Sequence, residues 1–255
     1  MAQKVLQINL KTLSFFFRVF LINFLLALSV SGHAVQTASD KTWEEMKTHF
    51  PISKDVRKKL QLKCIAVEII RQLDEPFIGY DWEIELFENP SANAFVLANG
   101  KIAIFTGIYR VATNQDELAM LIGHEVAHVT REHSRETINR KILTGLGRSV
   151  IEVATNGQMA IMMELLAAYG LDLPFERGQE FEADQEGLRL MAAAGFNPLA
   201  GFDFFRNMEK EHNIGNLEFL STHPLSKHRR KMLARNLQKP LDLYAKTGKK
   251  PRCRY

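Results

Sequence analysis

A run of five residues, His124-Glu125-Val126-Ala127-His128, constrains the fold more than any other part of the sequence. Apolar residues recur around it at helical spacing, so a helix is predicted from about Thr113, with Asp116 as candidate partner in a capping box. The side chains expected to face the core are Leu118, Leu121, Ile122, Val126 and Val129. Residues four apart on a helix leave the same face, one turn from each other. The sequence therefore predicts a helix that presents His124 and His128 side by side.

The spacing of the two histidines suits a metal ion. His124 and His128 could each place a ring nitrogen about 2.0–2.1 Å from one zinc ion. Glu125 lies roughly 100° further around the helix. It would flank the metal, where it could hold a metal-activated water and take its proton. The pattern H-E-x-x-H is typical of zinc-dependent hydrolysis; the alternative is two histidines on a hydrated helix face beside an unrelated glutamate.

A catalytic zinc site needs a third protein ligand and one open position. His133 is nearest in sequence, but it comes one residue too early for the extended motif, and an arginine stands where that motif needs glycine. Residues 180–184, Glu-Phe-Glu-Ala-Asp, offer a better candidate. Glu180 could bind the metal while Asp184, one turn away, accepts the second N–H of a ligand histidine. Alternatively these carboxylates only favour the positive end of a helix; Glu182 is expected to be solvated or in a local ion pair.

The remaining pattern predicts a mostly helical α+β fold with a small antiparallel sheet. Strands are expected at 82–86, 95–98 and 102–105, the last two joined by Asn99-Gly100, a dipeptide that favours positive φ at both positions of a hairpin turn. Further helices are expected at 53–75 (with Ser53 as N-cap and Pro76 as stop), 179–194 (ending at Gly195), 199–211 and 224–237. Residues 142–173 are expected to be mostly helical, and their role stays open.

The N-terminus has the pattern of an export signal. Basic residues at positions 4, 11 and 18 precede the apolar run 19–30, and small residues follow up to Ala34. We expect a signal peptide over 1–34 and a single domain over 35–255, in the periplasm. The alternative is a retained membrane anchor with the domain facing the periplasm, in which case the N-terminus would contact the membrane.

Composition excludes some classes of function. Hydrophobic residues at 46% and charged residues at 24% are ordinary globular values. The net charge of +4 lies largely at the two ends, without the basic stripe interleaved with aromatics that nucleic-acid binding would need. Cys64 and Cys253 could pair in an oxidising compartment and hold the C-terminal tail to an early helix, or Cys64 could be a small buried apolar residue.

Three motifs in order, HEVAH, ERGQEFEAD and STHPLSKHR, resemble the peptidase family of HtpX, BepA and the CAAX prenyl proteases, in particular its soluble exported branch. The likeness runs from about Asn93 to Arg229. It implies a gluzincin-like zinc metallopeptidase with a small sheet beside the zinc helix. It also implies one zinc ion per chain, with Glu180 as the third ligand.

The resemblance also draws attention to two residues of the third motif, STHPLSKHR. His223 is similar to a histidine that can occupy the open zinc position and hold the enzyme latent. Arg229 is similar to an arginine near the site, where a guanidinium could stabilise a developing oxyanion.

The predicted sheet suggests how a substrate would bind. Proteases commonly bind an extended peptide as an added strand, and the expected edge strand around Asn93, Phe95 and Val96 precedes the zinc helix. The sequence thus predicts a zinc endopeptidase acting on exported, misfolded or unassembled envelope proteins, with outer-membrane assembly proteins as candidate partners. The competing hypotheses are a binding module that cleaves little and a zinc hydrolase of other substrates.

Overall fold

The computed structural model describes residues 36–37, 39–137, 177–212, 219, 223 and 227–253. Within these residues the chain is mostly helical and has one three-stranded sheet, as the sequence predicted. The predicted export signal and the expected helical stretch 142–173 lie outside the described residues. No helix in the described part of the chain is both long and apolar enough to cross a bilayer.

The sheet is mixed, not purely antiparallel as predicted. It contains β1 (Glu83–Phe87), β2 (Ala94–Val96) and β3 (Lys101–Phe105), in the order β1-β3-β2. Strands β2 and β3 pair antiparallel, as the Asn99-Gly100 signal predicted, whereas β1 pairs parallel with β3. The reason is the strand order. After β1 the chain crosses to the far edge of the sheet and forms β2, which runs opposite to β1. The hairpin then turns the chain back, so β3 lies between the other two strands and runs in the same direction as β1.

The hairpin between β2 and β3 uses a different turn from the one expected. Leu97 and Lys101 form the last pair, so three residues connect the strands, and Gly100 N–H donates to Leu97 O at 3.0 Å. Gly100 has φ +84°, whereas Asn99 is not among the residues with positive φ. Three-residue hairpins with one left-handed residue are a common alternative to the two-residue turn.

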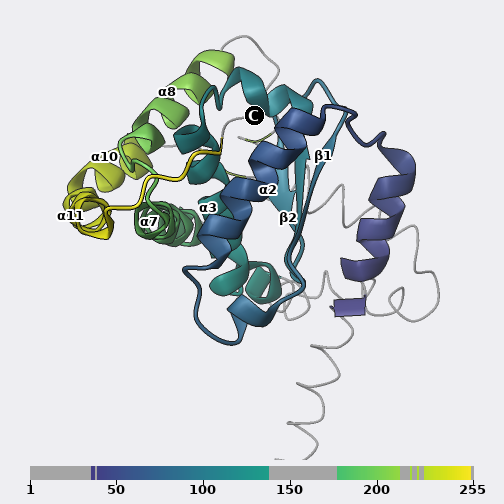
Figure 1. The fold of residues 1–255 in the computed structure, drawn as a ribbon, viewed down its shortest axis with the longest axis horizontal. Helices are drawn as coiled ribbons and strands as arrows, with labels where there is room; N and C mark the ends of the chain where they lie inside the picture. Colours follow the sequence, from purple (N-terminus) through teal and green to yellow (C-terminus); the bar gives the residue numbers. More distant parts are fainter. Residues whose placement is uncertain are drawn as a thin grey trace, which may run out of the picture.

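The helices of the described residues include α2 (Val56–Ile70), α3 (Gln115–Thr130), α7 (Arg177–Ala194), α8 (Ala200–His212), α10 (Lys227–Asn236) and α11 (Gln238–Thr247). Helices α2 and α3 contact the sheet, and α7, α8, α10 and α11 lie beyond α3 (Figure 1). Two 3-10 helices, η1 (Phe77–Gly79) and η2 (Thr106–Arg110), lie between them along the chain. Helix α11 and a helical stretch over 39–49 were not predicted.

Two predicted helix starts are corrected by local hydrogen bonds. Helix α2 begins after Asp55, whose side chain accepts from Lys58 N–H, and not after Ser53. Its end at Ile70 also comes earlier than expected. Helix α3 is capped by Asn114 in place of Thr113, and the capping partner is Glu117, which accepts from Thr113 N–H. Aspartate and asparagine are both strong N-caps, so both corrected starts follow ordinary capping chemistry. Glu117 lies three residues after the cap but bonds Thr113, the residue before it, so the contact is a variant of the capping box.

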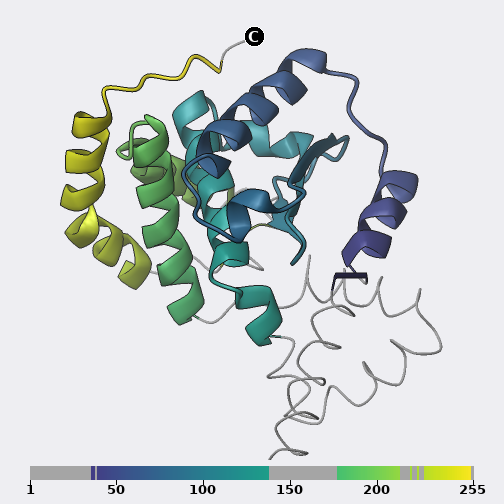
Figure 2. The same cartoon turned by 60° about the horizontal axis from the view of Figure 1, so that its bottom comes forward.

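Helix α3 is the centre of the packing. Every residue from Glu117 to Val129 is buried. Figures 1 and 2 show α3 between the sheet with α2 and the helices α7 and α8, while the helix over 39–49 covers the other side of the sheet. Trp43 and Met46 of that helix pack with Phe87, Phe95 and Phe105 in a second apolar cluster. A helix enclosed on all sides can hold polar side chains away from water.

Helices α3 and α7 meet through two glycines. A Cβ added to Gly123 would lie 2.9 Å from Gly187 O, and one added to Gly187 would lie 2.9 Å from His124 N. These are backbone atoms, which cannot turn aside as a flexible side chain can. The glycine pair therefore sets how closely the two helix backbones approach.

The two cysteines form a disulfide, which settles the open question of their pairing. Cys64 lies in α2, and Cys253 lies in the segment after α11, which runs back across the molecule (Figure 2). Gln115 at the start of α3 holds the same segment, because it donates to Pro251 O at 3.1 Å and accepts from Cys253 N–H at 3.0 Å. The C-terminal segment is thus tied to both α2 and α3.

Gly187→Ala should destabilise the protein, because the added methyl must push α7 away from α3. We expect a loss of about 1–3 kcal/mol, the usual range for overpacking in a close-packed interior. Gly178→Ala is the matched control, since a Cβ at this position of α7 meets no atom of the described residues within 4 Å. Urea unfolding measures both variants; equal stabilities would contradict the role of the glycine contact.

Candidate metal centre

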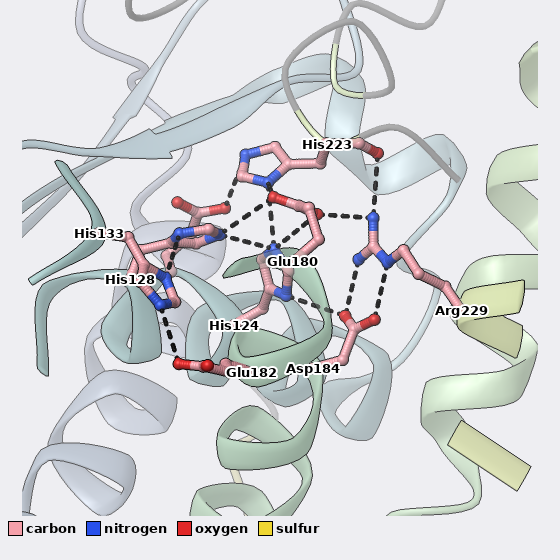
Figure 3. A network of polar contacts seen from close by, with 9 residues as sticks. His124, His128, His133, Glu180, Glu182, Asp184, His223 and Arg229 are labelled. Carbon is pink, nitrogen blue, oxygen red and sulfur yellow. Dashed lines mark hydrogen bonds and ion pairs between the residues drawn. The ribbon is translucent and has the colours of Figure 1, made fainter. Parts of the chain in front are cut away.

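Four side chains able to bind a metal converge in the interior. His124 and His128 leave the same face of α3, Glu180 comes from the first turn of α7, and His223 lies between α8 and α10. One ligand atom from each lies within 4.8 Å of the others, and all four residues are buried. Figure 3 shows the four side chains pointing toward one another. The structure thus brings together the three predicted ligands and the histidine that the family resemblance added.

The spacing of the ligand atoms fits a single zinc ion. His124 Nε2 lies 3.1 Å from both His128 Nε2 and His223 Nδ1. Glu180 Oε1 lies 2.9 Å from His223 Nδ1 and 3.4 Å from His128 Nε2. Donors bound to one zinc at about 2.0–2.1 Å in a tetrahedron stand roughly 3.3 Å apart. Three imidazole nitrogens and one carboxylate oxygen are also ligands that zinc prefers.

Asp184 lies behind His124, where the sequence predicted it. Its Oδ1 atom is 3.1 Å from His124 Nδ1, on the side of the ring that faces away from the other ligand atoms. The contact is an ion pair and not a hydrogen bond of good geometry, because Nδ1 has no hydrogen-bond partner among the described residues. A carboxylate at this position can still orient the imidazole so that Nε2 faces the other donors. Glu180 and Asp184 lie one turn apart on α7, so the same helix supplies a candidate ligand and the group that orients another.

Arg229 joins the acidic residues of the site. Its Nε and Nη2 atoms donate to the two oxygens of Asp184 at 2.8 and 2.7 Å, and its Nη1 lies 2.6 Å from Glu180 Oε2. Nη1 also donates to the backbone oxygen of His223 at 3.2 Å. The side chain is buried. All three guanidinium nitrogens are therefore engaged with Asp184, Glu180 or the backbone of His223. To stabilise an oxyanion, Nη1 would have to leave its present partners.

The electrostatics favour the metal-binding charge states of His128 and Glu180, whereas those of His223 favour its protonated form. Burial lowers the pKa of His128 well below its ordinary value, so its imidazole is neutral. Burial alone would raise the pKa of Glu180, but His223 and Arg229 outweigh it and hold that pKa well below its ordinary range. Burial would likewise lower the pKa of His223, but the carboxylates of Glu180 and Glu125 raise it. A neutral histidine and an ionised carboxylate are the forms that bind metals.

Glu125 lies beside the four ligand atoms with its carboxylate buried. Neither of its oxygens has a hydrogen-bond partner within the part of the chain that the structure describes, and His223 Nε2 is 3.6 Å from Oε1. Burial raises the pKa of Glu125, and the nearby His223 and His124 only partly offset this. A buried carboxylate lacking hydrogen bonds is costly, which points to a functional use of the group.

Sequence reasoning gave no role to His133, which lies next to the site. Its Nδ1 atom is 3.1 Å from His128 Nδ1, and its Nε2 atom is 3.5 Å from Glu182 Oε2. Burial lowers the pKa of His133 despite the nearby Glu182. Among the described residues, His133 is not one of the four side chains whose ligand atoms converge. His128 and His133 are five residues apart, which is not a regular helical spacing, so the sequence carries no signal for this contact.

Phe219 is a second residue without a sequence signal. Its ring stacks on the imidazole of His223, with centroids 4.3 Å apart and an interplanar angle of 18°. It also meets Phe204 edge-on, and its backbone N–H donates to Ala92 O at 3.3 Å. Phe219 thus anchors His223 both to the core and to the residues just before β2.

The predicted edge strand is at the edge of the sheet. Asn93 O accepts from Phe105 N–H, and Leu97 N–H donates to Lys101 O, so these residues face β3. Alternate residues of an antiparallel strand point the opposite way, so the backbone groups of Val96 face away from β3. Phe95 and Val96 are both largely buried. The side chain of Asn93 turns back to accept from Ala94 N–H at 2.9 Å.

Comparisons with known proteins agree with this geometry. The mitochondrial metalloendopeptidase OMA1 of Saccharomyces cerevisiae is 37% identical over 174 residues, which cover 65% of this chain and 50% of the relative. OMA1 of Danio rerio is 31% identical over 229 residues, which cover 83% of this chain and 47% of the relative. The β-barrel assembly-enhancing protease of Yersinia pestis is 27% identical over 151 residues, which cover 55% of this chain and 31% of the relative.

The aligned region is only part of each relative. The chain spans half or less of the length of these proteins. Residues 56–236, which include every residue of the converging set, match peptidase family M48. The chain therefore belongs to peptidase family M48.

Proposed function

We propose that this protein is a zinc-dependent endopeptidase with one zinc ion per chain. One observation carries the proposal: the ligand atoms of His124, His128 and Glu180 converge in the interior beside Glu125, a buried carboxylate whose oxygens have no hydrogen-bond partner among the described residues. Three ligands with a carboxylate next to them are the arrangement that metal-assisted peptide hydrolysis needs. Membership of a peptidase family supports the same reaction.

Each residue has a defined part in this proposal. His124, His128 and Glu180 would hold the zinc ion, which when bound supplies a Lewis acid that polarises a carbonyl and makes water acidic enough to attack. Glu125 takes a proton from the attacking water on a carboxylate oxygen and delivers one to the leaving amine nitrogen. Asp184 keeps the Nε2 atom of His124 directed at the other ligand atoms.

His223 supports a latent state. Its Nδ1 atom completes a four-donor set whose spacing matches a closed tetrahedron, and catalytic zinc sites keep one position open. The other ring nitrogen of His223 lies 3.6 Å from Glu125, so the same imidazole also covers the proposed base. Substrate could enter only after His223 moves away.

We propose that substrate binds along β2 as an added strand. The backbone groups of Val96 face away from β3, and β2 lies against α3, which carries the site. A cavity of about 130 Å³ adjoins His128 and the end of this strand, and could take a substrate side chain. Its lining residues are Gln36, Tyr80, Ala98, His128, Val129, Glu132, Ser134 and Arg135. Backbone pairing depends little on sequence, which suits the removal of misfolded or unassembled proteins.

Cleavage of casein by the purified full-length protein tests the reaction. Wild type should bind about one zinc ion and cleave slowly, and a chelator should abolish cleavage. Glu125→Gln should keep its zinc and lose roughly 10²–10⁴-fold in kcat, because it removes the proton acceptor and no ligand. His223→Ala should cleave faster than wild type, because the imidazole no longer covers the site.

The double variant Glu125→Gln/His223→Ala is the control, and any activity gained by opening the site must vanish in it. Zinc binding without cleavage by any variant would favour the binding-module hypothesis. Cleavage of esters or phosphates but of no peptide would favour a different hydrolase. Absence of zinc from the wild-type protein would contradict the metal centre itself.

Val96→Pro should raise KM without removing zinc, because proline lacks the N–H that faces the proposed substrate strand. Loss of one backbone hydrogen bond, worth about 1 kcal/mol, predicts roughly a five-fold higher KM for a peptide substrate. Val96→Ala is the matched control, since it shortens the side chain and retains the N–H. The hypothesis is wrong if KM is the same in Val96→Pro and in Val96→Ala.

We further propose that the chain is exported to the periplasm and acts on envelope proteins there, with outer-membrane assembly proteins as partners. The proposal rests on the N-terminal sequence and on the printed name of the Yersinia pestis relative, whereas the OMA1 relatives are named as mitochondrial. N-terminal sequencing of the protein purified from whole cells of a bacterial host should give a start at Val35. An intact first residue would favour the retained anchor.

A further inference from the structure

His128 has two ring nitrogens, and the structure gives each a different neighbour. Nε2 faces the other ligand atoms, 3.1 Å from His124 Nε2 and 3.4 Å from Glu180 Oε1. Nδ1 faces the opposite way and lies 3.1 Å from His133 Nδ1. Figure 3 shows His133 beside His128, with Glu182 below them.

The contact between two Nδ1 atoms specifies where protons lie. At 3.1 Å one of the two nitrogens must donate and the other accept. If Nε2 of His128 is to bind a metal, it carries no proton, so the proton of that neutral ring is on Nδ1. His133 then accepts at its own Nδ1 and carries its proton on Nε2, which is the atom that faces Glu182 at 3.5 Å.

The backbone is bent at some cost to place His133 there. Helix α3 ends at Thr130, and Glu132 follows with φ +54°, a left-handed conformation that non-glycine residues rarely adopt. The turn at Glu132 brings the next side chain back alongside His128, where it is buried at 1% exposure. A buried imidazole held by an unfavourable turn suggests a specific use of the contact.

The two histidines of α3 therefore have different outer partners. Asp184, a carboxylate, lies 3.1 Å from Nδ1 of His124, whereas His133, an imidazole, lies at the same distance from Nδ1 of His128. Glu182 contacts the far side of His133, although its own side chain is 59% exposed. The result is a chain of three side chains, from His128 through His133 to Glu182, that leads from the site to the protein surface.

We propose that His133 is a positioning residue that accepts the Nδ1–H of His128 and so holds Nε2 of that ring ready for the metal. This inference rests on the proposed zinc centre, because it assigns a function to a residue just outside it. His133 is not a ligand, since its nearest nitrogen faces the outer side of His128. Removal of such outer partners typically weakens metal binding 10–100-fold.

Zinc affinity, measured by competition with a chromogenic chelator, tests the proposal on the full-length protein. His133→Leu, which fills the space but accepts no hydrogen bond, should weaken zinc binding roughly 10–100-fold. His133→Asn keeps an acceptor near the position of Nδ1 and should stay within about three-fold of wild type. Ser134→Ala, at the neighbouring buried residue, is the control and should bind zinc like wild type.

A second measurement uses the wild-type protein, so it tests the proposal even if the His133 variants fail to fold. Histidine-ring ¹⁵N spectra of the zinc-loaded wild type should show His128 protonated at Nδ1. The reverse tautomer would overturn the proposal without any substitution. Equal zinc affinity in His133→Leu and wild type would also overturn it, while leaving the zinc centre intact. Equal losses in His133→Leu and His133→Asn, with matching losses of thermal stability in the metal-free protein, would indicate a packing role instead. Wild type that binds no zinc would reject the proposed function itself.

Discussion

The close contact between Gly123 of α3 and Gly187 of α7 is the constraint on which the rest of the site depends. Helix α3 carries His124, Glu125 and His128, while α7 carries Glu180 and Asp184, so the site exists only where the two helices meet. Larger residues at the glycines would separate the backbones. Carboxylates and imidazoles reach only a few ångströms from their helices, so this approach decides whether they can share one ion.

Burial of so many polar groups is possible because their charges balance. Glu180 and Asp184 are paired with Arg229, which contacts both and is itself buried. Arg229 also holds the backbone oxygen of His223, so the residue that neutralises the site also fixes the segment that covers it. Breaking a buried ion pair by removing one partner is strongly destabilising, which makes Arg229 a structural requirement whatever else it does.

The central helix, its two histidines and the carboxylates of α7 could be predicted because regular spacing along a helix determines which side chains share a face. The parallel pairing of β1 could not, since the strand order depends on where a connection crosses the sheet. The cap at Asn114 was missed by one residue because Thr113 has similar capping chemistry. The contacts of His133 and Phe219 depend on the turn at Glu132 and on stacking across distant segments, which no local pattern encodes.

The link between Cys64 and Cys253 closes a loop with a sequence separation of 189 residues. In the chain-entropy description, closing a loop of that size restricts the unfolded chain by about 5 kcal/mol. It also changes the outcome of limited proteolysis. A single backbone cut anywhere inside the loop leaves the two fragments covalently joined, so a nicked molecule keeps α7, α10 and α11 attached to α2.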